Sequence, residues 1–229
     1  MNISDRLKRI AGMVNRCSSI ADIGTDHGYI PIFLVKNRVC ERAVASDINR
    51  GPVLRALANV KKAGLEGAIE CRLGGGLGIV SPGEVEGAVI AGMGGYLIVD
   101  ILEERPEVVQ KLQFVVLQPV QHSVVMRKYL YNRGYDIIDE ELCYDEGKYY
   151  EIIKARFDGV SRDAEDIYYE IGSKLLEKKH PLLKEFIHFK IKKNEAAINA
   201  IKEDSESARL RKTVLIEWNA KLKEMLECL

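Results

Sequence analysis

The sequence predicts an α/β protein, in which a doubly wound, Rossmann-like sheet is followed by a separate α-helical region. Three observations support this class. Short runs of β-branched residues recur along the first part of the chain, helical patterns lie between them, and the last part has helical periodicity alone. Runs that are apolar along their whole length are typical of parallel strands that are buried on both faces.

The predicted parallel strands are residues 18–24, 42–48, 68–74, 87–95 and 111–119. The helices predicted between them are the segments YIPIFLVKNR, PVLRALANVKKAG and YLIVDILEERP. Residues 135–157 differ, because an acidic, glycine-containing turn joins two strand-like runs without a helix between them. We therefore expect the sheet to end in a C-terminal β-hairpin with antiparallel strands.

Residues 1–158 are predicted to form the first domain and residues 159–229 a second, coiled-coil-like domain, because apolar residues in the latter follow heptad spacing in two seams. The seams consist of Ile187, Ile191, Asn194, Ile198 and Ile201, and of Leu215, Trp218, Leu222, Met225 and Leu229. The polar stretch KEDSESA separates the seams. We expect an antiparallel helical hairpin whose first long helix starts near His180 and Pro181.

The composition excludes several classes of protein. Hydrophobic residues make up 47% of the chain and charged residues 30%, which is typical of a globular protein with a sizeable core. The formal net charge is zero, so the whole molecule carries no electrostatic signature of nucleic-acid binding. The five cysteines are scattered and form no C-x-x-C pair, which argues against a disulfide framework and against a metal site.

The sequence also shows no sign of a membrane protein. The segment MNISDRLKRIAGMV is charged every few residues, unlike a signal peptide, and no apolar run approaches the roughly 20 residues that span a bilayer. We expect a cytoplasmic protein without a membrane partner. The sequence leaves the oligomeric state open, with a monomer favoured.

The segment ADIGTDHGYIP places two carboxylates, a histidine and two glycines at the end of the first predicted strand and in the turn that follows it. Glycines in such a turn let the backbone approach a ligand at the start of a helix. Gly24 and Gly28 are present, but the third glycine of G-x-G-x-x-G is missing, which argues against an NAD-dependent oxidoreductase. An acid inside the turn suits a positively charged ligand without phosphate. S-adenosyl-L-methionine, with its sulfonium and ammonium groups, meets this description.

Two carboxylates at strand ends are expected to hold this cofactor. Asp22 ends the first strand, where it can pair with the methionine ammonium. Asp47 ends the second strand, at the position where an acid accepts hydrogen bonds from both ribose hydroxyls, and Ile48 directly after it is also expected to contact the cofactor. The alternative for Asp47 is a helix N-cap.

Glycine-rich segments after the later strands complete the predicted cleft. In RLGGGLGIV, the backbone at Gly75 and Gly76 is expected to lie flat against the adenine, with a flexible loop as the alternative. The cofactor-facing residues expected in AGMGG are Ala91, Gly92 and Met93. The residues expected on the substrate side are Gly94 and Gly95 and, in LQPVQHS, Gln118 and Pro119.

The chain contains, in this order, the motifs ADIGTDHGYIP, SDINRGPVLRA, IAGMGGYLI, LQP and EGKYYEI. Together they resemble those of the TrmK-type bacterial tRNA (adenine-22-N1)-methyltransferases. The resemblance implies a class I methyltransferase fold, S-adenosyl-L-methionine as the donor and N1 of adenine 22 in the tRNA D-arm as the acceptor. It also implies that the helical domain helps to hold tRNA. Two positions depart from the family pattern: Gly75 replaces the acid of G-D-G-L, and Val120 replaces the asparagine of Q-P-N.

This chemistry assigns roles to the first turn. N1 lies on the Watson–Crick edge, so the adenine must leave the stack, and its methylation creates a positive charge that a carboxylate stabilises. Asp26 is the predicted catalytic carboxylate, with a helix cap as the alternative. His27 either orients Asp26, shuttles a proton or is an ordinary turn residue, and Tyr29 either stacks on the flipped base or fills the core.

A lysine-rich stretch in the helical domain is the predicted contact to tRNA phosphates, with a solvated helix face as the alternative. The lysines are Lys174, Lys178, Lys179, Lys184, Lys190, Lys192 and Lys193.

Two further functions remain open at this stage: a methyltransferase that acts on another RNA base or a small molecule, and a non-catalytic RNA-binding protein with a degenerate methyltransferase fold. The motif [DN]-P-P-[FYW], typical of methylation at exocyclic amines, is absent after the fourth predicted strand.

Overall fold

The computed structural model describes residues 3–203 and 205–229. Their contacts divide the chain into two compact units, Met1–Asp163 and Ala164–Leu229. The boundary predicted after residue 158 falls directly behind the last strand of the sheet, β7 (Lys148–Phe157), a few residues before the division by contacts.

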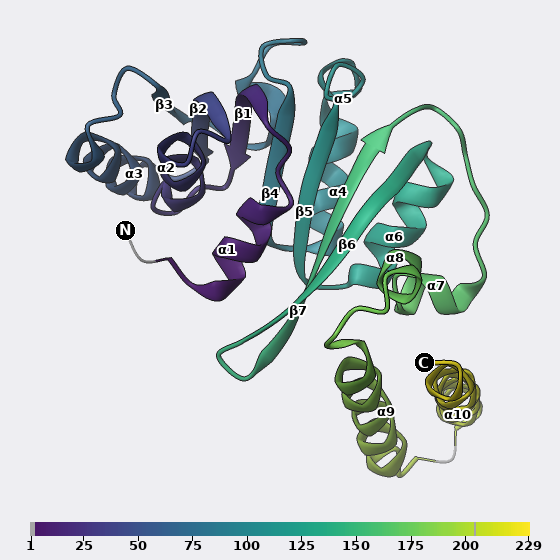
Figure 1. Ribbon diagram of the computed structural model, residues 1–229. Coiled ribbons are helices and arrows are strands. Elements are labelled where there is room, and N and C mark those ends of the chain that lie inside the picture. The colour runs from purple at the N-terminus through teal and green to yellow at the C-terminus, as the bar shows by residue number, and fades with distance from the viewer. Residues whose placement is uncertain (1–2, 204) are drawn as a thin grey trace. The chain divides into compact units, whose positions relative to one another are not determined.

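The first unit is built on one seven-stranded sheet with the order β3-β2-β1-β4-β5-β7-β6 (Figure 1). The parallel strands are β1 (Cys17–Ile23), β2 (Cys40–Asp47), β3 (Ile69–Leu73), β4 (Gly87–Gly94) and β5 (Phe114–Gln121). β7 is antiparallel to both β5 and β6 (Tyr135–Asp145). The predicted Rossmann-like α/β class and the terminal hairpin are thereby confirmed, and the strand order reverses at β1 and β4.

Helices cover both faces of this sheet, because its strands carry apolar side chains on both sides. One core lies between the sheet and α1, α2 and α3 and includes Ile32 and Val60; the other lies against α4, α5 and α6 and includes Ile98 and Met126. The helices are α1 (Asp5–Gly12), α2 (Tyr29–Lys36), α3 (Arg50–Ala63), the 3-10 helix η1 (Gly76–Ile79), α4 (Gly95–Glu104), α5 (Pro106–Val109) and α6 (Ser123–Asn132).

A buried group of charges attaches α6 to the hairpin. The side chain of Arg127 is 1% exposed, and its Nε lies 2.7 Å from Oε1 of Glu140 in β6. Its Nη1 lies 2.7 Å from Oε2 of Glu151 in β7. Burial disfavours the charged guanidinium, but the two carboxylates raise the pKa of Arg127 above its ordinary value. Because an unpaired charge here would be costly, the three side chains fix α6 against both strands.

In its described residues, the second unit contains helices and no strand. They are α7 (Asp166–Glu170), α8 (Ser173–Glu177), α9 (Leu183–Ala200) and α10 (Glu206–Glu227). The two long helices pack on each other through buried Ile187 and Leu222, and Asn194 donates a 2.9 Å hydrogen bond to Asn219 between them. This is the predicted helical hairpin, with Ile201 beyond the end of its first helix.

Candidate active site

A pocket of about 370 Å³ opens at the carboxyl ends of β1 and β4, the switch point at which open α/β sheets bind ligands. Most of its polar lining comes from the turn between β1 and α2. The lining residues are Arg6, Leu7, Asp22, Gly24, Thr25, Asp26, His27, Tyr29, Ile30, Ala91 and Gly92. All of them except Arg6, Leu7, Thr25 and Ile30 are residues that the sequence analysis selected.

Asp22 lies at the bottom of this pocket and is only 5% exposed. Burial raises the pKa of Asp22 to about 6, although a hydrogen bond from Thr25 lowers it. No basic side chain of the described residues forms an ion pair with Asp22. The turn above it is fixed by the N–H of Gly24, which donates to the carbonyl of Ser46 at 2.8 Å. The site therefore holds a buried acid that lacks a counter-ion.

Asp26 stands at the rim of the pocket, with 60% of its side chain exposed. It pairs with Arg55 of α3, and its Oδ2 lies 3.2 Å from Nε2 of His27. The imidazole in turn stacks on Tyr29, with ring centroids 5.0 Å apart and an interplanar angle of 11°. The N-cap of α2 is Gly28, and no side chain caps it, which removes the helix-cap alternative for Asp26. Its carboxylate is oriented by its neighbours and accessible to a ligand.

Arg6, on α1, is a lining residue that the sequence analysis missed. Its Nη1 donates to Oε1 of Gln118 at 2.7 Å, and its guanidinium lies 5.4 Å from the ring centroid of Tyr150. We expected Gln118 and Pro119 at the substrate side of the cleft, but both are buried, because β5 continues past them to Gln121. Gln118 instead contacts Arg6, so the pocket lining contains a cation as well as the two aspartates.

The end of β4 is irregular, with register shifts around Met93. Gly92 is exposed and has a φ of +77°. The side chain of Met93 points toward the turn between β1 and α2: a Cβ on Gly24 would lie 2.1 Å from Cε of Met93. Gly95 is buried, and a Cβ there would lie 2.3 Å from the carbonyl oxygen of His122. Its expected place on the substrate side is therefore corrected: Gly95 lets α4 approach the loop after β5. A Cβ on Gly94 would lie 3.4 Å from Gln121.

The loops after β2 and β3 lie next to each other. The side-chain carboxylate of Asp47 accepts a 2.7 Å hydrogen bond from the N–H of Asn49, the N-cap of α3. The backbone carbonyl of Asp47 accepts a 2.9 Å hydrogen bond from the N–H of Gly74. Ile48 is 73% exposed, and a Cβ on Gly75 would lie 3.4 Å from its Cδ1. These residues form a surface beside the pocket, whereas Gly76 is buried against α4.

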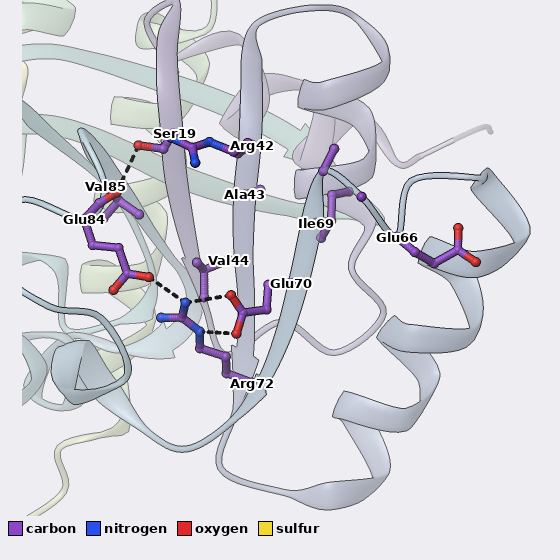
Figure 2. A pocket seen from close by; sticks show the side chains of 12 residues that line it. Ser19, Arg42, Ala43, Val44, Glu66, Ile69, Glu70, Arg72, Glu84 and Val85 are labelled. Atoms are coloured by element: carbon purple, nitrogen blue, oxygen red, sulfur yellow. Dashed lines mark hydrogen bonds and ion pairs between the residues drawn. The ribbon is translucent and has the colours of Figure 1, made fainter.

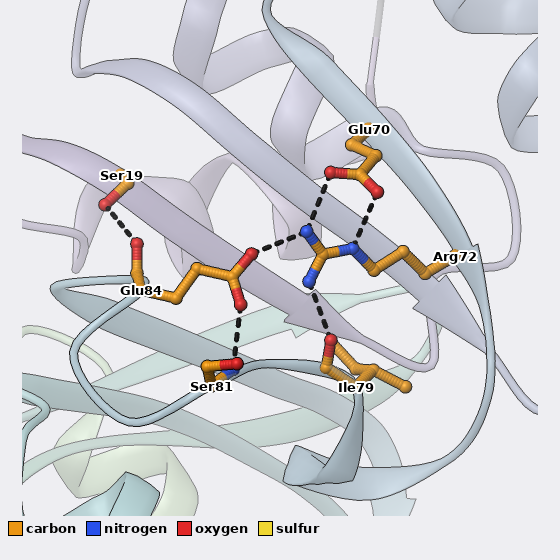
Figure 3. Close-up of polar contacts among 6 residues, drawn as sticks. All are labelled: Ser19, Glu70, Arg72, Ile79, Ser81 and Glu84. Carbon is orange, nitrogen blue, oxygen red and sulfur yellow. Dashed lines mark hydrogen bonds and ion pairs between the residues drawn. The ribbon is translucent and has the colours of Figure 1, made fainter.

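A second pocket, of about 340 Å³, is lined by residues of β1, β2 and β3 and of the segment before β4 (Figure 2). Arg72 of β3 is one of the lining residues; it pairs with Glu70 at 2.7 Å and Glu84 at 2.5 Å and donates to the carbonyl of Ile79 at 2.7 Å. Glu84 also accepts the N–H of Ser81 at 2.8 Å (Figure 3). Arg72 lowers the pKa of both glutamates. This network anchors the segment between η1 and β4 to β3.

In the helical unit, the predicted lysine strip divides into two kinds of side chain. The exposed members are Lys178, Lys179, Lys184, Lys192 and Lys193. Lys190 differs, because it is 13% exposed and forms a 2.8 Å ion pair with Glu170. Lys174 pairs with Glu177, also at 2.8 Å. The expectation for Lys190 is therefore corrected: its ammonium holds α7 to α9.

Within residues 3–203 and 205–229, no three His, Cys, Asp or Glu side chains gather as a metal site. The same residues include no helix with the length and apolar character needed to cross a membrane.

Residues 3–153 match the family model described as a methyltransferase domain. The tRNA (adenine(22)-N(1))-methyltransferase of Bacillus subtilis (strain 168) is 37% identical over 171 residues, which cover 72% of each chain. The crystal structure of the B. subtilis m1A22 tRNA methyltransferase TrmK matches with a TM-score of 0.87 and 31% identity, over 98% of this chain and 99% of that chain. The M. capricolum TrmK, in complex with S-adenosyl-homocysteine, matches with a TM-score of 0.84 and 29% identity, over 96% and 98%. The chain belongs to the family of tRNA (adenine(22)-N(1))-methyltransferases.

Proposed function

We propose that the protein transfers the methyl group of S-adenosyl-L-methionine to N1 of adenine 22 in tRNA. Membership of the family supports the reaction and the substrate. The observation that carries the proposal in this chain is the pocket at the switch point, where buried Asp22 lacks a counter-ion and accessible Asp26 stands at the rim.

The pocket fits the amino-acid end of the cofactor. The carboxylate of Asp22 would pair with the methionine ammonium, and Arg6 offers a cation to the methionine carboxylate. Gly24, Ala91 and Gly92 have little or no side chain, which leaves room for the cofactor between the two strand ends.

The surface beside the pocket fits the nucleoside end. Asp47 would accept hydrogen bonds from the ribose hydroxyls, and the exposed side chain of Ile48 with the backbone of Gly75 would flank the adenine. When bound, the cofactor supplies a methyl group that its sulfonium already activates. The contribution of the protein is therefore alignment, exclusion of water and stabilisation of charge.

At the acceptor, the role of Asp26 follows from where charge develops. Methylation at N1 spreads a positive charge over N1 and N6 of the adenine, and a nearby carboxylate stabilises that charge and accepts the N6 proton. Arg55 and His27 fix the orientation of this carboxylate. Tyr29, which lines the same pocket, would stack on the base.

The exposed lysines of the helical unit would contact tRNA phosphates, which orients the substrate without reading its sequence.

Mass spectrometry of nucleosides tests the proposal. The protein is incubated with S-adenosyl-L-methionine and an unmodified tRNA transcript, and in parallel with a transcript in which adenine 22 is guanine. We expect 1-methyladenosine from the first transcript and none from the second. A methylated nucleoside at another position would identify a different acceptor, and bound cofactor without any methylated product would support a non-catalytic RNA-binding protein instead.

A further inference from the structure

Two aromatic side chains lie at the same edge of the sheet as the pocket, outside the residues used so far. Tyr96 is in the first turn of α4, directly after β4, and His122 directly follows β5. Because β4 and β5 are adjacent and parallel, both rings lie just past neighbouring carboxyl ends. Their centroids are 5.0 Å apart, with an interplanar angle of 58°.

The backbone holds this pair in place. His122 has a φ of +59°, in the left-handed region that a residue with a side chain adopts at a cost. The N-terminus of α4 packs directly on it, because Gly95 has no Cβ to meet the carbonyl oxygen of His122. Strained residues of this kind persist where the surrounding structure fixes them, and they cluster at functional sites.

The surroundings of the pair suit a flat apolar group. Tyr96 is 58% exposed, and two neighbours in the chain, Leu97 and Val120, are 50% and 52% exposed. Gln121, between Val120 and His122, is also exposed and carries no charge. An aromatic and aliphatic surface without a cation is poorly matched to a phosphate and well matched to the face of a nucleobase.

The proposed reaction creates a need for such a surface. When adenine 22 leaves the stack to enter the pocket, the base beside it loses a stacking partner. An exposed aromatic ring just past the carboxyl end of β4, the same sheet edge at which the pocket opens, can replace that partner, and stacking of one base on an aromatic side chain tolerates any base identity.

We propose that Tyr96, supported by His122, is the platform on which a nucleobase next to adenine 22 stacks while the adenine occupies the pocket. The inference rests on the proposed function and adds to it a substrate-contacting residue outside the pocket.

Kinetics of three variants test the proposal. Tyr96→Ala should raise the KM for tRNA about 5- to 150-fold, which corresponds to the loss of one stacked base. Its kcat and its Kd for S-adenosyl-L-methionine should stay at wild-type values. Tyr96→Phe keeps the ring and should stay within about twofold of wild type in KM. His122→Asn keeps a residue that tolerates positive φ and should give a smaller rise than Tyr96→Ala. A wild-type KM in Tyr96→Ala overturns the proposal, as does an equal loss in Tyr96→Phe.

Tyr144→Ala is the matched control. Tyr144 is 54% exposed and forms a similar tilted pair with Tyr149, with centroids 4.8 Å apart, but it lies in the β6–β7 hairpin. We expect no change in the KM for tRNA. An increase equal to that of Tyr96→Ala would show a general loss of affinity and overturn the specific assignment.

Fluorescence of 2-aminopurine, placed in separate transcripts on either side of adenine 22, reports the stacking directly. At one of the two positions, the wild-type complex should stay quenched and the Tyr96→Ala complex should become bright. Equal fluorescence of the two complexes at both positions overturns the proposal. If the wild-type protein forms no 1-methyladenosine, the proposed function fails together with this inference; if it does and Tyr96→Ala keeps the wild-type KM, this inference alone fails.

Discussion

The two pockets of the first unit have similar volumes, about 370 and 340 Å³, but their polar groups are arranged in opposite ways. In the pocket over β1, β2 and β3, Arg72 is paired with two glutamates and a carbonyl of its own chain. At the carboxyl strand ends, Asp22 is buried without a counter-ion and Asp26 faces solvent. Charges that pair with one another hold a loop in place, whereas a buried carboxylate without a counter-ion is typical of a binding site. Volume alone would not have separated the two.

The largest effect is expected at Asp26. Asp26→Ala should lower the rate of methyl transfer about 10²- to 10⁴-fold, the range for a positioned acid or base. Its free energy of unfolding should change by less than about 1 kcal/mol, because the ion pairs that it loses are exposed. Single-turnover kinetics and thermal unfolding measure the two quantities. Arg55→Ala removes only the orienting partner and should show a smaller loss of rate. Wild-type turnover in Asp26→Ala would exclude the catalytic role.

Asp22 should make cofactor binding depend on pH. Its pKa is raised to about 6, and only the ionised form pairs with an ammonium. The Kd for S-adenosyl-L-methionine should therefore rise about tenfold for each pH unit below 6 and be constant above 7. Asp22→Asn should bind weakly at every pH in this range. Calorimetric titration between pH 5 and 8 measures both, and a flat profile for the wild type would contradict the assignment.

The same carboxylate should destabilise the free protein. Because the pKa of Asp22 in the folded state lies above its ordinary value of 3.8, its contribution to stability is fully present below pH 3.8 and is lost as pH rises through about 6. At pH 8 without cofactor, Asp22→Asn should be more stable than the wild type by about 1–3 kcal/mol. Urea unfolding measures this, and a less stable variant would show that Asp22 is a structural residue.

The lysines extend the comparison to the helical unit, where Lys190 is paired and Lys192 and Lys193 are exposed. Reversing the charge of the exposed two, by Lys192→Glu with Lys193→Glu, should raise the KM for tRNA several-fold and reduce its salt dependence by about one power of salt concentration per lysine. Lys190→Met should instead lower stability and leave the salt dependence unchanged. Identical salt profiles for all the variants would mean that this helix face is only solvated.

The smallest effect is expected at Arg72. Arg72→Ala should lower the free energy of unfolding by about 1 kcal/mol, because the network is partly exposed, and leave kcat unchanged. Arg72 lowers the pKa of Glu84, so the contribution of this pair is present above pH 4.5 and is lost as pH falls below it. The free energies of unfolding at pH 7 and at pH 3.5 should therefore differ less in Arg72→Ala than in the wild type. A large loss of kcat would contradict a purely structural role.

The strands and the hairpin could be predicted because their signals are local. An apolar run that ends at an acid identifies β1 and β2, and an acidic turn with a glycine identifies the hairpin. The predicted helices do not include α1 and α6. α1 has two buried residues, Ile10 and Ala11, in a charged segment. α6 buries Arg127, a residue type that is usually exposed, and its pairing with Glu140 and Glu151 cannot be inferred from the sequence around it.

The same difference between local and long-range signals explains which residues of the site could be predicted. Asp22, Asp26 and His27 could be selected because one short turn contains them all. Arg6 could not, because it joins the pocket from α1 and is held there by Gln118, 112 residues away in the chain. Its one local signal is the N-cap Ser4, two residues before Arg6, whose hydroxyl accepts the N–H of Leu7.

Because β7 lies between β5 and β6, the sheet is incomplete until residues 148–157 have left the ribosome. Until then β5 has an unpaired edge to which strands of other chains can add, and β6 has no strand with which to pair. Glu151 arrives with the same strand, so Arg127 gains its second counter-ion only at this step. A nascent chain therefore keeps this strand edge unpaired until β7, the last strand of the sheet to be translated, is available.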